Sequence, residues 1–287
     1  MSRQKVIISA ALTGALTTRA QCPAIPYTPA EIADEGLRAV EAGAAILHIH
    51  ARNDDGSPTF AVSKFEEIKA EVRARCPDVI INFSTGAIGL PREERIAHVL
   101  ATKPDMAALN MGSMNYAIYS KKAKKFYHDF VFQNPFKDIG YFLEKMKSVG
   151  TRPEMESFDT GHIHNANPFI DMGLLPKPYT FSFVMGVLGG IPATPENLLH
   201  QSRQIPSDAF WQSIVISRKQ WAIASTAITA GGNFRVGLED NFYLPDGEMA
   251  KSNGELVAAG VTLARTLGRE PASIAETRDI LTIPLRD

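Results

Sequence analysis

The sequence has few cysteines, no long hydrophobic run and no excess of charge of either sign. Its two cysteines, Cys22 and Cys76, lie outside any Cys-x-x-Cys pair, which excludes a disulfide framework. No stretch approaches ~18 uninterrupted apolar residues, so the sequence predicts no transmembrane helix. A formal net charge of −1 gives no bulk attraction for nucleic acid or for an anionic membrane, and we expect neither partner.

The first residues of the sequence do not have the pattern of a secretory signal peptide, and we expect none. Lys5 precedes an apolar run, but polar Ser9 and Thr13 interrupt that run early. We therefore expect a cytoplasmic protein. A hydrophobic content of 45% and a charged content of 21% are ordinary for a soluble globular protein with a sizeable core. The length of 287 residues suits two modest domains or one large α/β barrel.

Short β-like runs alternate with amphipathic helical stretches from end to end. The expected strands are Val6–Leu12, Ala45–His50, Val79–Phe83, Met106–Met111, Glu154–Phe158, Thr180–Met185, Gln212–Ser217 and Phe234–Leu238. The expected helices are Pro29–Ala42, Ser63–Arg75, Pro91–Thr102, Pro135–Val149, His162–Met172, Pro195–Gln204, Lys219–Thr229 and finally Lys251–Leu267. No Pro/Gly/Ser-rich linker divides the pattern, so it predicts an α/β fold, a single (β/α)₈ TIM barrel domain over residues 1–287.

Two connections in this pattern are open to two interpretations each. Residues 115–134 form the longest connection, which we expect to be irregular, and its "SKKAKK" segment (120–125) could attract CoA phosphates or be a solvated loop or subunit contact. The "GVLGGIPAT" segment (186–194) could let a CoA pantetheine approach the backbone, although a glycine pair after a strand is more often a tight turn.

The segment "ILHIHARNDDG" (46–56) ends an apolar strand with two histidines and continues into a polar turn. Alternate residues of a strand share a face, so His48 and His50 point the same way. They could be two ligands of one metal ion or a pair of core histidines. Active sites of these barrels lie at the carboxyl ends of the strands, which favours the metal.

The end of the eighth strand supplies a further group of polar residues. Catalytic zinc takes three protein ligands and keeps one position open. Glu239 is the best candidate for the third ligand, because the eighth strand lies close to the second around the ring. Arg235 and Glu239 share a strand parity, and Asp240 follows where the strand breaks and could act as a base.

Several separated motifs, in order, resemble the β-keto acid cleavage enzymes, the family of 3-keto-5-aminohexanoate cleavage protein. The motifs are "IISAALTGALTTRAQCPAIPYTPAEIA", "HIHARNDDG", "FSTGAIG", "AALNMGSMN" and "FRVGLEDN", and the resemblance covers nearly the full length. It implies a zinc-dependent barrel, with one Zn²⁺ per chain and acetyl-CoA as co-substrate. Such a barrel converts a β-keto acid and acetyl-CoA into acetoacetate and a new acyl-CoA. It also implies a homotetramer.

The resemblance assigns roles to individual residues. His48, His50 and Glu239 match the metal ligands, Asp240 matches the catalytic aspartate, and Arg235 matches its supporting arginine. The serine that contacts the polar head of the substrate matches Ser84, which stands with Thr85 and Gly86 in a turn that we expect to bind substrate.

Two positions depart from the type member of the family. Leu16 stands where that member has a glutamate that meets the substrate ammonium group, and Ala108 stands where it has a threonine. Both changes remove polarity around the substrate tail. We therefore expect an uncharged tail, or an anionic tail met by a basic group such as Arg19.

Two other functions compete with this interpretation. A metal-dependent hydrolase or aldolase on the same barrel would use the His-x-His pair with His162 and His164, although the pair is on the second strand and no histidine follows the sixth. A non-catalytic metal- or CoA-binding barrel is disfavoured by Asp240 and Arg235 beside the ligand set.

Overall fold

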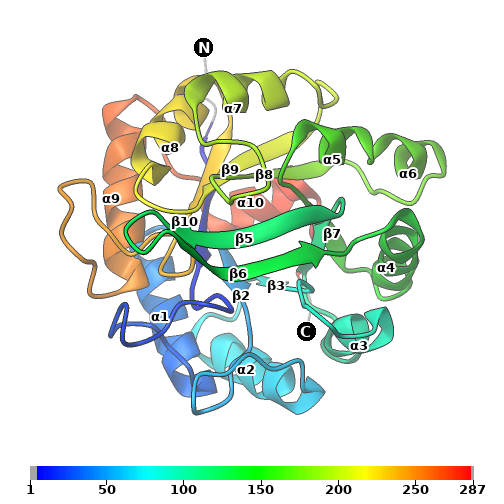
Figure 1. Ribbon diagram of the computed structural model, residues 1–287, viewed down its shortest axis with the longest axis horizontal. Coiled ribbons are helices and arrows are strands. Elements are labelled where there is room, and N and C mark those ends of the chain that lie inside the picture. Colours follow the sequence, from blue (N-terminus) through cyan, green and yellow to red (C-terminus); the bar gives the residue numbers. More distant parts are fainter. Residues whose placement is uncertain (1–4, 286–287) are drawn as a thin grey trace.

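A closed barrel of parallel strands forms the centre of the protein in the computed structural model, which describes residues 5–285 (Figure 1). Around the ring the strand order is β1-β10-β9-β8-β7-β4-β3-β2. The barrel strands are β1 (Ile8–Ala11), β2 (Ile46–Ile49), β3 (Ile80–Phe83), β4 (Met106–Asn110), β7 (Arg152–Ser157), β8 (Thr180–Met185), β9 (Phe210–Val215) and β10 (Asn233–Val236). The prediction of one α/β barrel is therefore confirmed, while residues 1–4 and 286–287 of the predicted domain lie outside the described residues.

Helices surround the barrel and connect its strands. They are α1 (Pro29–Ala42), α2 (Val62–Arg75), α3 (Arg92–Thr102), α4 (Phe136–Ser148), α5 (Thr160–His164), α6 (Asn167–Asp171), α7 (Pro195–Ser202), α8 (Gln220–Thr229), α9 (Asn253–Thr266) and α10 (Ile274–Leu281). Local chemistry sets several of the starts. Thr28 forms a capping box with Glu31 in front of Pro29, for example, which satisfies backbone N–H groups of the first turn. None of the described helices is long and apolar enough to span a membrane.

The seventh barrel strand and the helix after the fifth differ from expectation in detail. The strand covers Phe210–Val215 rather than 212–217, and the predicted helix 162–172 is two short helices, α5 and α6. Two features were not predicted at all. One is the hairpin in residues 114–132, and the other is helix α10, which follows the helix expected to be last.

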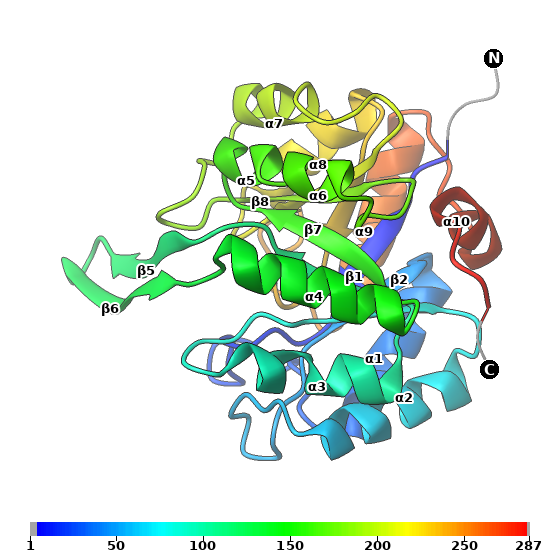
Figure 2. The ribbon, with the colours of Figure 1, turned by 90° about the vertical axis from the view of Figure 1, so that its right-hand side faces the viewer.

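The expectation of an irregular connection over residues 115–134 is wrong. Strands β5 (Met114–Ser120) and β6 (Lys125–Phe132) form an antiparallel hairpin there, with Met114 opposite Phe132 and Ser120 opposite Lys125. The lysine-rich turn makes the two strands hard to recognise in the sequence. Lys124 in this turn adopts a left-handed backbone with φ of 48°. Figures 1 and 2 show the hairpin lying across the end of the barrel and projecting outward from it.

The base of the hairpin is fixed to the loop that follows β8. The Ala117 N–H donates to the Leu188 carbonyl at 3.3 Å. A Cβ on Gly189, which has a φ of +104°, would lie 1.8 Å from the Asn115 carbonyl oxygen, so only glycine permits this close approach. Gly189 therefore contributes to docking the hairpin. The Gly190 N–H donates to the Val187 carbonyl at 3.0 Å, which confirms the tight turn expected of this glycine pair.

The opposite end of the barrel is closed by α10 (Figure 2). Leu281 and Ile283 join a buried cluster with Ile7, Ile46 and Ile80 from the amino-terminal ends of the strands. Helix α10 begins with a second capping box, formed by Ser273 and Glu276. The barrel is therefore plugged by apolar side chains at this end, which leaves the carboxyl ends of the strands for polar chemistry.

Candidate active site

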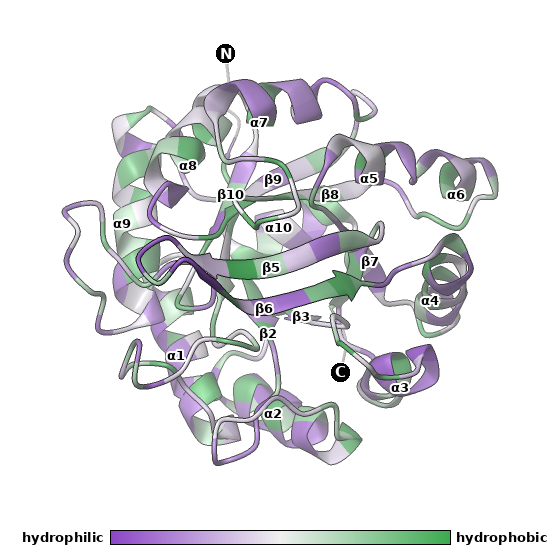
Figure 3. Ribbon diagram, viewed as in Figure 1, coloured by the Kyte–Doolittle hydropathy of each residue, from purple (hydrophilic) through white to green (hydrophobic). Residues whose placement is uncertain are grey.

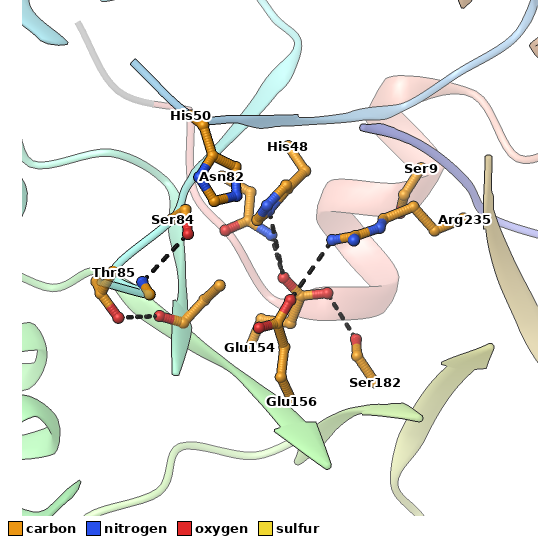
Figure 4. Close-up of polar contacts among 12 residues, drawn as sticks. Ser9, His48, His50, Asn82, Ser84, Thr85, Glu154, Glu156, Ser182 and Arg235 are labelled. Atoms are coloured by element: carbon orange, nitrogen blue, oxygen red, sulfur yellow. Dashed lines mark hydrogen bonds and ion pairs between the residues drawn. The ribbon is translucent and has the colours of Figure 1, made fainter. Parts of the chain in front are cut away.

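His48 and His50 lie at the carboxyl end of β2, as the alternation of the strand predicts. His48 is in β2, in register with Ala11 of β1 and Asn82 of β3, and its side chain is 1% exposed. His50 follows the strand, and its side chain is 15% exposed. The two ring centroids are 5.2 Å apart, so both imidazoles face the same space inside the barrel mouth (Figure 4).

Glu239 reaches the two histidines from the turn after β10. The strand ends at Val236, earlier than expected, but the Glu239 N–H donates to the Ala11 carbonyl at 3.2 Å and fixes the turn beside β1. Glu239 Oε1 lies 3.5 Å from His48 Nε2 and 3.4 Å from His50 Nε2. Gly14, with φ of +62°, makes room for this side chain, because a Cβ there would be 2.7 Å from Glu239 Cγ.

These three side chains have the chemistry and spacing of a metal site. One ligand atom from each lies within 4.8 Å of the others. Glu239 Oε2 and His48 Nδ1 are buried without a hydrogen-bond partner. A buried carboxylate oxygen normally has a partner, and a cation at this position would provide one. Two imidazoles and one carboxylate with further open positions suit a catalytic zinc ion.

A second group with metal-ligand spacing consists of His48, Glu154 and Glu156. Glu154 is already occupied, because its carboxylate accepts hydrogen bonds from Asn82, Ser182 and Gln212. Its Oε2 also lies 3.9 Å from His48 Nδ1. No hydrogen bond joins these two atoms, whereas the other ring nitrogen, Nε2, lies 3.5 Å from Glu239 Oε1, which favours the set His48, His50 and Glu239 as the metal site.

Arg235 joins the acidic groups of the site. Its Nε and Nη2 donate to the two carboxylate oxygens of Asp240 at 2.8 and 2.7 Å. The same guanidinium lies 3.2 Å from Glu239 Oε1 and 3.5 Å from Glu156 Oε1. One arginine therefore faces three carboxylates, and this excess of acidic groups favours binding of a cation.

Burial and charge shift the acidic groups of the site in different directions. Burial would raise the pKa of Glu239, but the charges of His48, His50 and Arg235 hold it well below its ordinary value. Burial raises the pKa of Asp240, and its two hydrogen bonds from Arg235 offset only part of that effect. Burial and the neighbouring Glu154 raise the pKa of Glu156 to about 7. The pKa of Asp240 is thus raised while that of Glu239 is lowered, which makes Asp240 the more basic of these two carboxylates and suits proton transfer.

The Ser84-Thr85-Gly86 turn follows β3, next to the end of β2. The Ser84 N–H donates to the Ile49 carbonyl at 3.1 Å, and Ser84 Oγ accepts from the Gly86 N–H at 3.2 Å. Thr85 instead turns its hydroxyl to the Ala108 carbonyl, 2.6 Å away (Figure 4). The Thr85 side chain therefore supports the turn.

Leu16 and Ala108 lie on different parts of the barrel. Ala108 is fully buried in β4, in register with Glu154 of β7, whereas Leu16 is 42% exposed in the loop after β1. Strands β2 and β3 separate β1 from β4. The loop that carries Leu16 is held by Arg52, whose guanidinium donates to the carbonyls of Gly14 and Thr17 at 2.6 and 2.9 Å.

Three other predicted site residues do not join the metal ligands. His162 Nδ1 accepts from the Phe158 N–H at 3.2 Å, and His164 contacts Asn167. Arg19 forms an ion pair with Glu31 and so already has a carboxylate partner. These contacts weaken the hydrolase interpretation and the expectation of an anionic tail bound by Arg19.

Sequence reasoning missed the polar groups beneath the metal ligands and the anchor of the first loop. Ser9, Asn82, Ser182 and Gln212 form a buried network around Glu154. The sequence feature that could have revealed them is one polar residue at an inward-facing position in each of four otherwise apolar strands. Arg52 continues the parity of His48 and His50, which could have indicated that it faces the same side.

Comparisons with known proteins agree with this geometry. The family described as beta-keto acid cleavage enzyme matches residues 5–283. The 3-keto-5-aminohexanoate cleavage enzyme of Acetoanaerobium sticklandii is 41% identical over 98% of this chain and 99% of its own length. The 3,5-dioxohexanoate:acetyl-CoA acetone transferase of Paraburkholderia graminis is 37% identical over 98% of this chain and 97% of its own length. The apo structure of ObcA shares the fold, with a TM-score of 0.78 at 20% identity, over 91% of this chain and 66% of ObcA.

Proposed function

The chain belongs to the beta-keto acid cleavage enzyme family, and we propose that it transfers an acyl group from a β-keto acid to CoA. The co-substrate is acetyl-CoA, and the products are acetoacetate and a new acyl-CoA. The names of the relatives from A. sticklandii and P. graminis support a cleavage of this kind. The observation that carries the proposal is Asp240, held by two hydrogen bonds from Arg235 beside His48, His50 and Glu239.

The proposed metal is one zinc ion per chain, held by His48 Nε2, His50 Nε2 and a Glu239 carboxylate oxygen. When bound, zinc supplies Lewis-acid polarisation of a carbonyl oxygen. Glu154 Oε2 lies 3.9 Å from the other ring nitrogen of His48, Nδ1. A homotetramer and a cytoplasmic location remain predictions from the resemblance and the composition.

Asp240 moves the proton in the proposed reaction. Its carboxylate takes a proton from the carbon between the carboxylate and the ketone of the β-keto acid, and that carbon attacks the acetyl thioester. The CoA thiolate released then attacks the original keto carbon, and the carbon–carbon bond breaks to give the new acyl-CoA. Asp240 returns its proton to the acetoacetate carbon, so the residue ends as it began. Arg235 positions Asp240 throughout, because its Nε and Nη2 donate to the two oxygens of that carboxylate.

The substrate is proposed to be a β-keto acid with an uncharged tail. Ser84 and Gly86 are placed to meet the polar head, with Thr85 supporting their turn. Leu16 offers no counter-charge at the rim, Ala108 offers no hydrogen bond, and Arg19 is paired with Glu31. A charged tail would therefore be left without a partner.

A coupled assay tests this proposal. We expect acyl-CoA and acetoacetate to form from a panel of β-keto acids with acetyl-CoA and Zn²⁺, and we expect one zinc per chain by elemental analysis. His48→Ala and His50→Ala should lose most of the metal, whereas His200→Ala, an exposed position on α7, should keep it. Full zinc retention in both ligand variants, or no acyl-CoA from any substrate, would contradict the proposal.

A further inference from the structure

The turn of the hairpin carries a dense group of lysines that form no ion pair in the described part of the chain. Lys121, Lys122, Lys124 and Lys125 are all exposed. None of these four lysines makes an ion pair within residues 5–285, whereas Lys5, Lys64 and Lys177 do. Asp129 is the sole acidic residue between 114 and 132. The tip is thus strongly positive on a chain whose net charge is −1.

The same tip also carries exposed aromatic rings. Tyr119 and Phe126 pack together, with ring centroids 5.0 Å apart, and their exposed fractions are 41% and 51%. Tyr127 is 61% exposed. At the base of the hairpin, in contrast, the rings are packed, with Tyr116 stacked on Phe130. Figure 3 shows a hydrophilic tip and a hydrophobic end of β6 near the barrel.

The position of the hairpin relates this tip to the active site. The hairpin is fixed over the barrel mouth by the bond from Ala117, in the middle of β5, to Leu188 and by Phe132 at the base, which packs with Phe158. A strand of seven residues, such as β5, extends about 20 Å at a rise of ~3.3 Å per residue. The tip therefore lies about 20 Å along β5 from the base of the hairpin, a length that an extended, chain-like ligand reaching into the mouth would span.

We propose that the hairpin tip binds the 3′-phosphoadenosine diphosphate end of CoA. This inference rests on the proposed function, in which CoA is the acyl carrier. CoA has its phosphates and its adenine at one end of the pantetheine arm and its thioester at the other. Lysine ammonium groups attract the phosphates, and an exposed aromatic ring offers a stacking surface for adenine. With the thioester near Asp240, the pantetheine arm runs along the hairpin.

The test is equilibrium binding of CoA, dephospho-CoA and pantetheine by calorimetry, which does not depend on turnover. The variant is Lys121→Gln/Lys122→Gln, and the matched control is Lys145→Gln/Lys147→Gln on the last turn of α4. Lys124 is left unchanged because of its left-handed backbone. We expect the Kd for CoA to rise about three- to tenfold in the hairpin variant, with little change in the control. The difference in Kd between the hairpin variant and the wild type should be smaller at high salt, and smaller for pantetheine than for CoA.

Acetyl-CoA turnover provides a second readout. The KM for acetyl-CoA should rise in the hairpin variant while kcat stays within about twofold, and turnover of acetyl-pantetheine should be unaffected. Phe126→Ser should weaken CoA and dephospho-CoA alike, because both contain adenine. Circular dichroism checks that each variant is folded, and Lys125→Gln is the substitute if the double variant is not.

The outcomes separate this inference from the proposed function. An unchanged Kd for CoA in the hairpin variant overturns the inference, and a loss of oligomer with unchanged CoA affinity would instead assign the tip to a subunit contact. Lysine-dependent CoA binding without acyl-CoA formation from any β-keto acid would reject the proposed function and keep the inference. No CoA binding by the wild-type protein would reject both.

Discussion

Arg235 and Asp240 are joined by two parallel hydrogen bonds, of 2.8 and 2.7 Å, and the Asp240 side chain has no exposed surface. A bidentate arginine fixes both the position and the plane of a carboxylate. Because Arg235 also faces Glu239 and Glu156, the orientation of Asp240 is linked to that of the metal ligands.

Asp240→Asn should keep the metal and lose most turnover. The asparagine keeps the shape of the side chain and can still accept one bond from Arg235, but it cannot accept a proton from the substrate. The expected fall in kcat is ~10²–10⁴-fold, the usual scale for a positioned acid–base group. Asp246→Asn, an exposed change in the following turn, should retain normal kcat. Near-normal turnover of Asp240→Asn with metal bound would assign the proton transfer to another residue.

Gly14→Ala should weaken metal binding. Gly14 and Gly89 both have positive φ, of 62° and 73°, so alanine at either position costs roughly 1–2 kcal/mol of stability. Only at Gly14 does the new Cβ meet Glu239, and Gly89 has open space around it. We expect zinc affinity to fall ~10–100-fold in Gly14→Ala, as for other changes that displace a ligand indirectly. Equal zinc affinity in Gly14→Ala and Gly89→Ala would show that Glu239 is not a ligand.

His98 should make the protein less stable in mild acid. Burial among the rings of Phe60, Phe65 and Phe83 lowers the pKa of His98 to about 3. In the unfolded chain His98 therefore binds a proton below about pH 6.5, whereas in the folded protein it stays neutral until about pH 3. The free energy of unfolding therefore falls as the pH drops from 6.5 toward 3. At pH 5 the contribution of His98 is about 2 kcal/mol less favourable than at pH 7.

Urea unfolding of wild type and His98→Phe at pH 7 and pH 5 measures this effect. The phenylalanine keeps the stacked ring but has no proton to bind, so its loss of stability between the two values of pH should be smaller by about 2 kcal/mol. An identical pH dependence of the two proteins would show that His98 is protonated in the folded state.

Leu16→Glu should shift the substrate preference toward an amino-bearing β-keto acid. Leu16 is 42% exposed, so an ion pair formed there contributes at most about 1 kcal/mol, or roughly fivefold in kcat/KM. The measurement compares 3-keto-5-aminohexanoate with neutral β-keto acids for wild type, Leu16→Glu and the uncharged control Leu16→Gln. A wild-type preference for the amino substrate would mean that another residue recognises the cation.

The sequence predicted the helices and strands that depend on interactions between residues close together in the chain. Alternating strand residues placed His48 and His50 on one face, and the capping signals around Thr28 and Pro29 set the start of α1. The hairpin was missed because its pairing is cross-strand and its turn residues are lysines rather than Asn-Gly or Asp-Gly. The network around Glu154 was missed for a different reason. Its partners Asn82, Ser182 and Gln212 come from three other strands and meet only when the barrel closes.

Strand β1 pairs with β10, so two strands from opposite ends of the chain must meet to close the barrel during synthesis. Ile8 lies opposite Phe234, and Ile7 and Asn233, joined by a hydrogen bond, are 226 positions apart. A ribosome that has made only the first part of the chain has released β1 with one edge unpaired, and that edge finds its partner only after Val236 emerges. Unpaired strand edges attract other chains, and contacts between distant segments form slowly. The nascent protein therefore carries an open edge for most of its synthesis, and the ring is completed by one of its last strands.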